Sequence, residues 1–148
     1  DSDWSSDVCS SDLEPLIADG TARIVHVHFP LDRLALAGAM LVSCLPAERR
    51  WAGLGMLYDS QSAWAQAETP RAVLERKLAQ AGLGAGEVEA CLADQALAGD
   101  ILDTQEIAQS EVGVRATPTF RVIGPGGMET LRGAVAGPRL VEAVTDAR

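Results

Sequence analysis

The fold of this chain is decided by one stretch, Gly113-Val114-Arg115-Ala116-Thr117-Pro118-Thr119-Phe120-Arg121-Val122. A helix is predicted to end at Gly113, and an apolar strand is predicted to begin directly after Pro118. Proline cannot donate a hydrogen bond to a sheet ladder, so it is tolerated at the first residue of a strand. A Thr-Pro bond at such a corner is a candidate for the cis form. The chain is therefore expected to turn sharply from helix into strand here.

Downstream of this stretch the pattern is that of a β-hairpin followed by a helix. Thr119–Ile123 and Met128–Arg132 are predicted strands. The four residues between them, Gly-Pro-Gly-Gly, form a strong hairpin signal. Pro138 then fits the first turn of a last helix.

Upstream of the stretch the chain is mostly helical. Arg23–Phe29 is predicted to be a strand because it is rich in β-branched residues and Pro30 closes it. Glycines and prolines delimit the predicted helices, which are the tail of one at Glu14–Asp19, Leu34–Leu45, one opening at Pro46, one from Thr69 to Gly82, Glu87–Ala93, and one carrying Leu97 to Val112. The order of elements predicts an α/β fold.

Composition limits the possible functions. The chain has 148 residues, which fits one domain, and 47% of them are hydrophobic. The formal net charge is -9 and no cluster of basic residues interleaves with aromatic ones, which argues against a nucleic-acid partner. The longest apolar stretch, Leu34–Leu45, has the length of a buried helix and is too short to cross a bilayer.

The first 13 residues differ from the rest. They are rich in Ser and Asp and show neither helical nor strand periodicity, whereas the chain from Glu14 onward is periodic and rich in Ala, Leu and Gly. We interpret residues 1–13 as a foreign or disordered leader, of the kind that a sequencing or assembly scar leaves. A natural polar leader is the alternative. Residues 14–148 are expected to form one partial domain with a helical insertion at about residues 33–112.

The remaining chain resembles the DsbA-like thiol-disulfide oxidoreductases, which have the thioredoxin fold. The resemblance covers Glu14 to the C-terminus and depends on the order of five segments. These are Asp19-Gly20, His28-Phe29-Pro30-Leu31-Asp32, the Ala-rich helix reaching Cys44 and followed by Trp51, Cys91-Leu92, and Gly113-Val114 leading into Thr117-Pro118-Thr119-Phe120. The resemblance implies a thioredoxin-like fold with a helical insertion.

The redox centre that this family implies is a Cys-x-x-Cys pair at the start of its first helix, where helix amides stabilise a thiolate. The three cysteines here are Cys9, Cys44 and Cys91, and none of them has that spacing. We expect the first strand and the redox pair to be missing, no catalytic residue to be present, and the fragment to be inactive. Cys9 lies in the leader with no basic neighbour, so it is not expected to be catalytic.

The resemblance also implies a substrate site and partners. Ala116, Thr117 and Pro118 would hold an extended peptide by strand addition. The implied partners are extended peptides or unfolded proteins that carry cysteine, and a membrane or soluble redox partner. No cofactor, metal or nucleic acid is implied. The implied location is periplasmic or otherwise extracytoplasmic.

Two pairs of residues have open interpretations. Cys44 and Cys91 are either separate buried thiols or a structural disulfide, and we favour the disulfide because some family members carry a second bridge in the insertion. His26 and His28 alternate on the predicted strand and face the same way. They could bind a metal, but with no third ligand evident a surface or packing role is preferred.

Two other functions fit the same fold. Kappa-class glutathione transferases and chromene-carboxylate isomerases use a serine or a single cysteine in place of the pair, and usually lack a bridge like Cys44–Cys91. A non-catalytic thioredoxin-like domain that binds peptides at the Thr117-Pro118 edge is the other alternative. It would require a natural N-terminus without redox cysteines.

Overall fold

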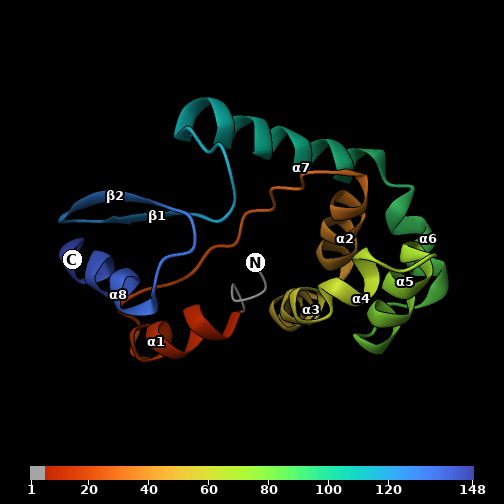
Figure 1. Ribbon diagram of the computed structural model, residues 1–148, viewed down its shortest axis with the longest axis horizontal. Coiled ribbons are helices and arrows are strands. Elements are labelled where there is room, and N and C mark those ends of the chain that lie inside the picture. The colour runs from red at the N-terminus through yellow and green to blue at the C-terminus, as the bar shows by residue number, and fades with distance from the viewer. Residues whose placement is uncertain (1–5) are drawn as a thin grey trace. The chain divides into compact units, whose positions relative to one another are not determined.

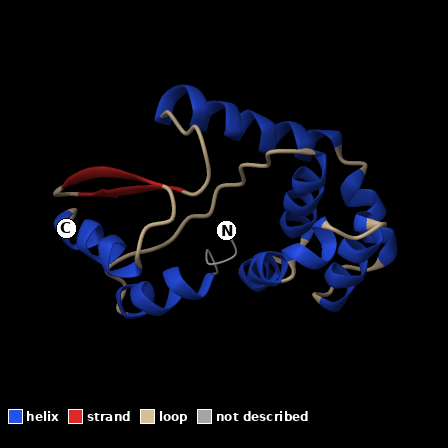
Figure 2. Ribbon diagram, viewed as in Figure 1, coloured by secondary structure: helices blue, strands red, loops and turns tan. Residues whose placement is uncertain are grey.

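The computed structural model describes residues 6–148 (Figures 1 and 2). Its elements in chain order are α1 (Ser6–Ala18), α2 (Arg33–Cys44), α3 (Ala47–Asp59), α4 (Gln61–Ala65), α5 (Pro70–Gln80), α6 (Ala85–Leu92), α7 (Gln95–Ile107), the π-helix η1 (Ala108–Val112), β1 (Thr119–Gly124), β2 (Gly127–Arg132) and α8 (Gly137–Asp146). The chain divides into two compact units. One is Val27–Ala108, and the other takes in the chain up to His26 and from Gln109 onward. The fold is thus α/β but mostly helical.

The helical unit is built around α2, which is apolar nearly all round. Asp32 caps it, because its carboxylate accepts a hydrogen bond from the backbone N–H of Ala35 at 2.8 Å. Its neighbours in space are α3, α5, α6 and α7. Leu41, Leu74 and Leu78 are at most 1% exposed and form the centre of this core. A helix that is hydrophobic on all sides is expected to be buried in this way.

The second unit contains the β-hairpin. The antiparallel register pairs Thr119 with Arg132 at the open end and Gly124 with Gly127 at the turn. Beside the hairpin lies α8, and α1 lies alongside α8 (Figure 1). The small core of this unit consists of buried residues from α1, β2 and α8, namely Leu13, Leu131, Leu140 and Ala143. The hairpin turn is tied to the end of α8 because Gly126 N–H donates to the Ala147 carbonyl at 2.8 Å.

The predicted strand at Arg23–Phe29 is wrong, since the structure has no strand there. Within residues 6–148, the sheet consists of β1 and β2. Val25 is 69% exposed and Val27 is 50% exposed, so this segment has the side chains of a strand without a ladder partner. Strand preference measures how well side chains fit a pleated, half-buried surface, and it does not form a strand by itself.

The first helix, α1, contains most of the predicted helix tail at Glu14–Asp19, but it extends back to Ser6, into the stretch that shows no helical periodicity. Leu13 explains part of this difference. It is only 7% exposed and belongs to the same core cluster as Leu131 and Leu140. Tertiary packing therefore supports a helix that the local sequence does not signal. The helix includes much of the stretch interpreted as a leader, whose foreign origin stays a prediction.

Two further helical features were not expected. The short helix α4 lies between α3 and α5, where Trp64 is buried and its indole N–H donates to the Leu57 carbonyl at 2.8 Å. The helix predicted to run through to Val112 changes after Ile107 into the π-helix η1. π-Helical turns occur often at functional sites, and this one leads directly into the stretch from Gly113 to Val122.

Candidate functional site

The chain turns from helix into strand through the loop Gly113–Pro118, which we call the proline loop. Gly113 has φ +78°, a left-handed conformation that favours glycine, and it ends the helical segment as predicted. Val114 is 9% exposed and anchors the loop, whereas Ala116 and Thr117 are exposed. The Thr117–Pro118 peptide bond is cis. The three residues predicted to hold a substrate peptide therefore lie on one short surface loop.

Three hydrogen bonds attach the proline loop to the hairpin. Arg132 Nη1 donates to the Gly113 carbonyl at 3.1 Å, and Thr119 Oγ1 donates to the Ala116 carbonyl at 2.8 Å. Gly133 N–H donates to the Pro118 carbonyl at 2.9 Å. The carbonyls at the start, middle and end of the loop are thus each held by a residue at the open end of the hairpin.

Between these attached carbonyls lies Thr117, whose backbone N–H and carbonyl we call open because they have no hydrogen-bond partner in the described part of the chain. Backbone polar groups need partners, and an exposed pair like this one is satisfied by water or by another extended chain. The Thr117 N–H and carbonyl are therefore available to hydrogen-bond an external group.

Thr119 and Arg132 were not predicted as site residues, although the sequence holds the signal that places them. The two-residue turn between Gly124 and Gly127 fixes the register, and counting back along both strands brings Thr119 opposite Arg132. Both residues therefore lie at the hairpin's open end, next to the proline loop. What the sequence alone does not show is that each side chain reaches back to a loop carbonyl.

Cys44 and Cys91 form a disulfide in the helical unit, with their Cα atoms 6.3 Å apart. Cys44 is the last residue of α2, and Cys91 lies in α6 with 4% of its surface exposed. The bridge joins two helices that also pack against each other. Cys9 lies in α1, but its side chain is outside the described part of the structure.

The two histidines do not share a strand face, because the predicted strand is absent. His28 Nε2 lies 3.3 Å from Ser43 Oγ, and that hydroxyl donates to the Ala39 carbonyl at 2.8 Å. The ring is therefore the donor to Ser43. Burial lowers the pKa of His28 below its ordinary value. Among the described side chains, no group of three or more His, Cys, Asp or Glu is arranged to hold a metal ion.

None of the helices in residues 6–148 combines the length and the hydropathy that crossing a membrane requires. The longest apolar helix, α2, is buried in the core of its unit. This agrees with the expectation that Leu34–Leu45 is a core helix.

Comparisons with known proteins place these features in a family. A family model described as thioredoxin matches residues 3–126. The crystal structure of Wolbachia pipientis alpha-DsbA1 matches with a TM-score of 0.71 and 20% sequence identity, covering 82% of this chain. The match spans 65% of the length of that structure. No curated protein matches the chain. The chain belongs to the DsbA-like thioredoxin family.

Proposed function

We propose that this chain is the peptide-holding part of a DsbA-like thiol-disulfide oxidoreductase, and that it binds extended segments of cysteine-containing proteins at the proline loop. The observation that carries the proposal is the open backbone of Thr117 between three held carbonyls. Because the loop is already held in place, peptide binding costs less conformational entropy, which favours affinity. Ala116, Thr117 and Pro118 are substrate-positioning residues in this account.

The chain is proposed to carry out no dithiol exchange by itself. Thiol-disulfide exchange requires a thiolate that attacks a disulfide sulfur and forms a mixed disulfide. Two of the three cysteines are joined to each other within the helical unit, and no two cysteines have Cys-x-x-Cys spacing. Cys9 has no basic neighbour in sequence that would lower the pKa of its thiol. A redox partner would act on the complete dithiol centre and not on this chain.

The Cys44–Cys91 bridge supports an extracytoplasmic location, since disulfides persist in oxidising compartments such as the bacterial periplasm. The same bridge counts against the kappa-class and isomerase-like enzymes, which usually lack it. A non-catalytic peptide-binding domain remains a second candidate function. It is favoured by the same open loop, and it would require a natural N-terminus without redox cysteines.

Strand addition at the loop is tested with N-methylated peptides. An extended peptide whose cysteine is replaced by serine is labelled, and its affinity for the purified chain is measured by fluorescence anisotropy. Each backbone amide is then methylated in turn, which removes one donor and leaves the side chains unchanged. Thr117 offers one carbonyl, and successive N–H groups of a strand alternate in direction, so methylation is expected to weaken binding at the peptide residue paired with Thr117 and to be tolerated at its two neighbours. Strand addition is contradicted if methylation changes the affinity at no position, or if it lowers the affinity equally at neighbouring positions.

The absence of redox turnover is tested separately. The chain is expected neither to oxidise a dithiol peptide nor to reduce insulin. Cys9→Ser is the matched control, because it removes the cysteine outside the bridge. Turnover that persists in Cys9→Ser would contradict the proposal, while the peptide-binding result would be unaffected.

A further inference from the structure

One face of the β1–β2 hairpin carries two arginines, Arg132 at the open end and Arg121 further along β1. Residues directly opposite each other in an antiparallel pair share a face, and the register pairs Thr119 with Arg132 and Arg121 with Thr130. These four residues make up what we call the arginine face. The opposite face contains Phe120 and Leu131 and packs in the core with α8. The arginine face is therefore the side of the hairpin turned away from α8.

The charge around the proline loop is opposite to that of the whole chain. The segment from Gly113 to Gly133 contains Arg115, Arg121 and Arg132, with Glu129 as its one acidic residue. Glu129 lies on the opposite face and is bonded to Arg139 of α8. The formal net charge of the chain, by contrast, is -9. The loop and the arginine face, which together we call the positive patch, thus carry an excess of basic residues in a chain that is acidic overall.

The three arginines of this patch retain donors for a ligand. In the described chain, none of them forms an ion pair. Arg132 uses Nη1 for the Gly113 carbonyl, and Arg121 places Nε and Nη2 at 3.0 and 2.8 Å from the sulfur of Met128. A guanidinium has five N–H donors in a fixed fork that matches the two oxygens of a carboxylate. Arg132 is fixed beside the proline loop by its bond to Gly113, with most of its donors unused.

We propose that the loop selects peptides that carry Asp or Glu side chains beside the segment it pairs with, and that Arg132 is the main specificity-determining residue. The inference rests on the proposed peptide-binding function. A peptide added at Thr117 is extended, so every second side chain projects toward one face. A carboxylate projecting toward the arginine face meets the unused donors of Arg132, while Arg115 and Arg121 add to the attraction. The remainder of the chain is acidic and repels such a peptide, so we expect acidic peptides to be favoured only at this patch.

The test compares a Glu-containing extended peptide with its Gln isostere, both with serine in place of cysteine. The readout is the ratio of their affinities for the chain, measured by fluorescence anisotropy at low and high salt. We expect the wild-type chain to bind the Glu peptide about threefold to tenfold more tightly, as exposed charge-assisted contacts allow, with a smaller ratio in high salt. Arg132→Gln should bring the ratio close to one, and Arg132→Lys should retain part of it.

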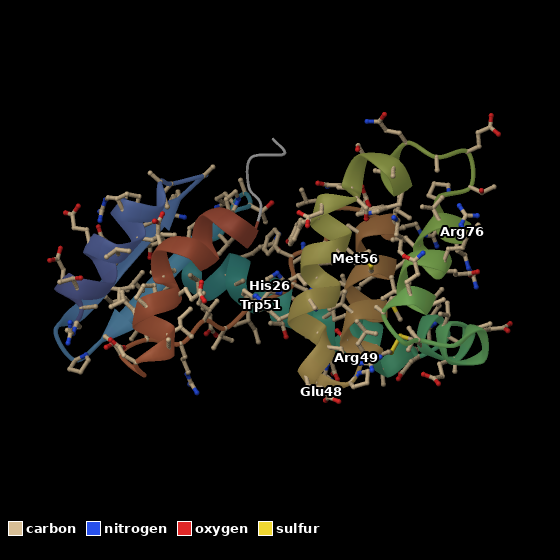
Figure 3. All side chains as sticks on the ribbon, turned by 90° about the horizontal axis from the view of Figure 1, so that it is seen from below. His26, Glu48, Arg49, Trp51, Met56 and Arg76 are labelled. Carbon is tan, nitrogen blue, oxygen red and sulfur yellow. A yellow bond between two sulfur atoms is a disulfide. The ribbon has the colours of Figure 1, made fainter. Side chains whose placement is uncertain are left out.

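Arg76→Gln is the matched control, because Arg76 is an exposed arginine of α5 in the helical unit (Figure 3). It makes the same change in net charge and should leave the ratio unchanged. Should Arg132→Gln fail to fold, Arg121→Gln removes a charge from the same face without touching the loop, and it should lower the ratio. A wild-type ratio of one, or a ratio that falls as much in Arg76→Gln, overturns the selectivity. Failure of both peptides to bind would overturn peptide binding at the loop and this inference with it.

Discussion

Thr119 and Arg132 lie opposite each other at the open end of the hairpin, and each side chain holds a different carbonyl of the proline loop. One cross-strand pair therefore fixes the loop at Ala116 and at Gly113. Thr117, which lies in the same loop, keeps its backbone groups open. The hairpin register thus connects a local turn signal to the geometry of the proposed binding loop.

Thr119→Val is expected to weaken peptide binding. The substitution keeps the shape of the side chain but removes the hydroxyl that donates to Ala116. A lost hydrogen bond of this kind corresponds to about 0.5–1.5 kcal/mol, or roughly twofold to tenfold in affinity. Thr119→Ser restores the donor and should restore most of the affinity, as anisotropy titrations can show. Equal affinities for the Val and Ser variants would indicate that the hydroxyl does not position the loop.

The Cys44–Cys91 bridge is expected to stabilise the helical unit. It joins residues 47 apart in sequence, and closing a loop of that size reduces the entropy of the unfolded chain by an amount equivalent to about 4 kcal/mol. The double variant Cys44→Ser/Cys91→Ser should lose free energy of unfolding of that order in urea titrations. In the unfolded, non-reduced wild-type chain, a thiol assay should detect Cys9 alone. Detection of three thiols, or a double variant as stable as the wild type, would contradict the pairing.

Gly124→Ala is expected to destabilise the unit that contains the hairpin. A methyl group at this position would overlap the carbonyl oxygen of Ala147, which is backbone and cannot rotate away. Overpacking of this kind costs about 1–3 kcal/mol. Gly99→Ala is the control, because a methyl group there meets nothing within 4 Å and Gly99 lies in the interior of α7. That variant should gain about 0.5–1 kcal/mol, since alanine favours helix. Equal thermal unfolding midpoints for the two variants would contradict the packing described.

Stability is expected to fall as the pH decreases through the range in which histidine titrates. Burial lowers the pKa of folded His28, so the unfolded chain binds its proton first as the pH falls below about 6.5. The contribution of neutral, buried His28 to the free energy of unfolding is therefore fully present above that pH and decreases below it. His28→Gln should flatten this part of the dependence of the unfolding free energy on pH. Identical pH profiles for the wild type and His28→Gln would show that the burial of His28 has no such effect.

Much of the fold follows from local chemistry. Gly82 has φ +107° and ends α5, and Gly113 ends the helical segment before the loop, because both positions need a conformation that favours glycine. The hairpin follows from a turn signal between two β-rich runs. The apolar composition of Leu34–Leu45 predicted the buried helix α2 to within one residue at each end. These features depend on a few neighbouring residues, so the sequence shows them directly.

The features that were missed depend on distant residues. Arg23–Phe29 has strand-forming side chains, but a strand also needs a ladder partner, which periodicity cannot supply. The first helix is supported by the burial of Leu13 against residues of the hairpin unit, far along the chain. Arg132 acts on Gly113 across 19 residues of sequence, and arginine at a strand end is ordinarily interpreted as a surface charge. Only the tertiary arrangement distinguishes these cases.

The central claim is that an extended peptide pairs with the backbone of the proline loop, and amide chemical shifts test it most directly. The chain is labelled with ¹⁵N and titrated with a neutral extended peptide that has serine in place of cysteine. We predict that the largest shift changes occur at Ala116, Thr117 and Thr119, with little change in α5 and α6. Saturable binding that leaves these three amides unchanged and shifts signals of the helical unit would contradict the account.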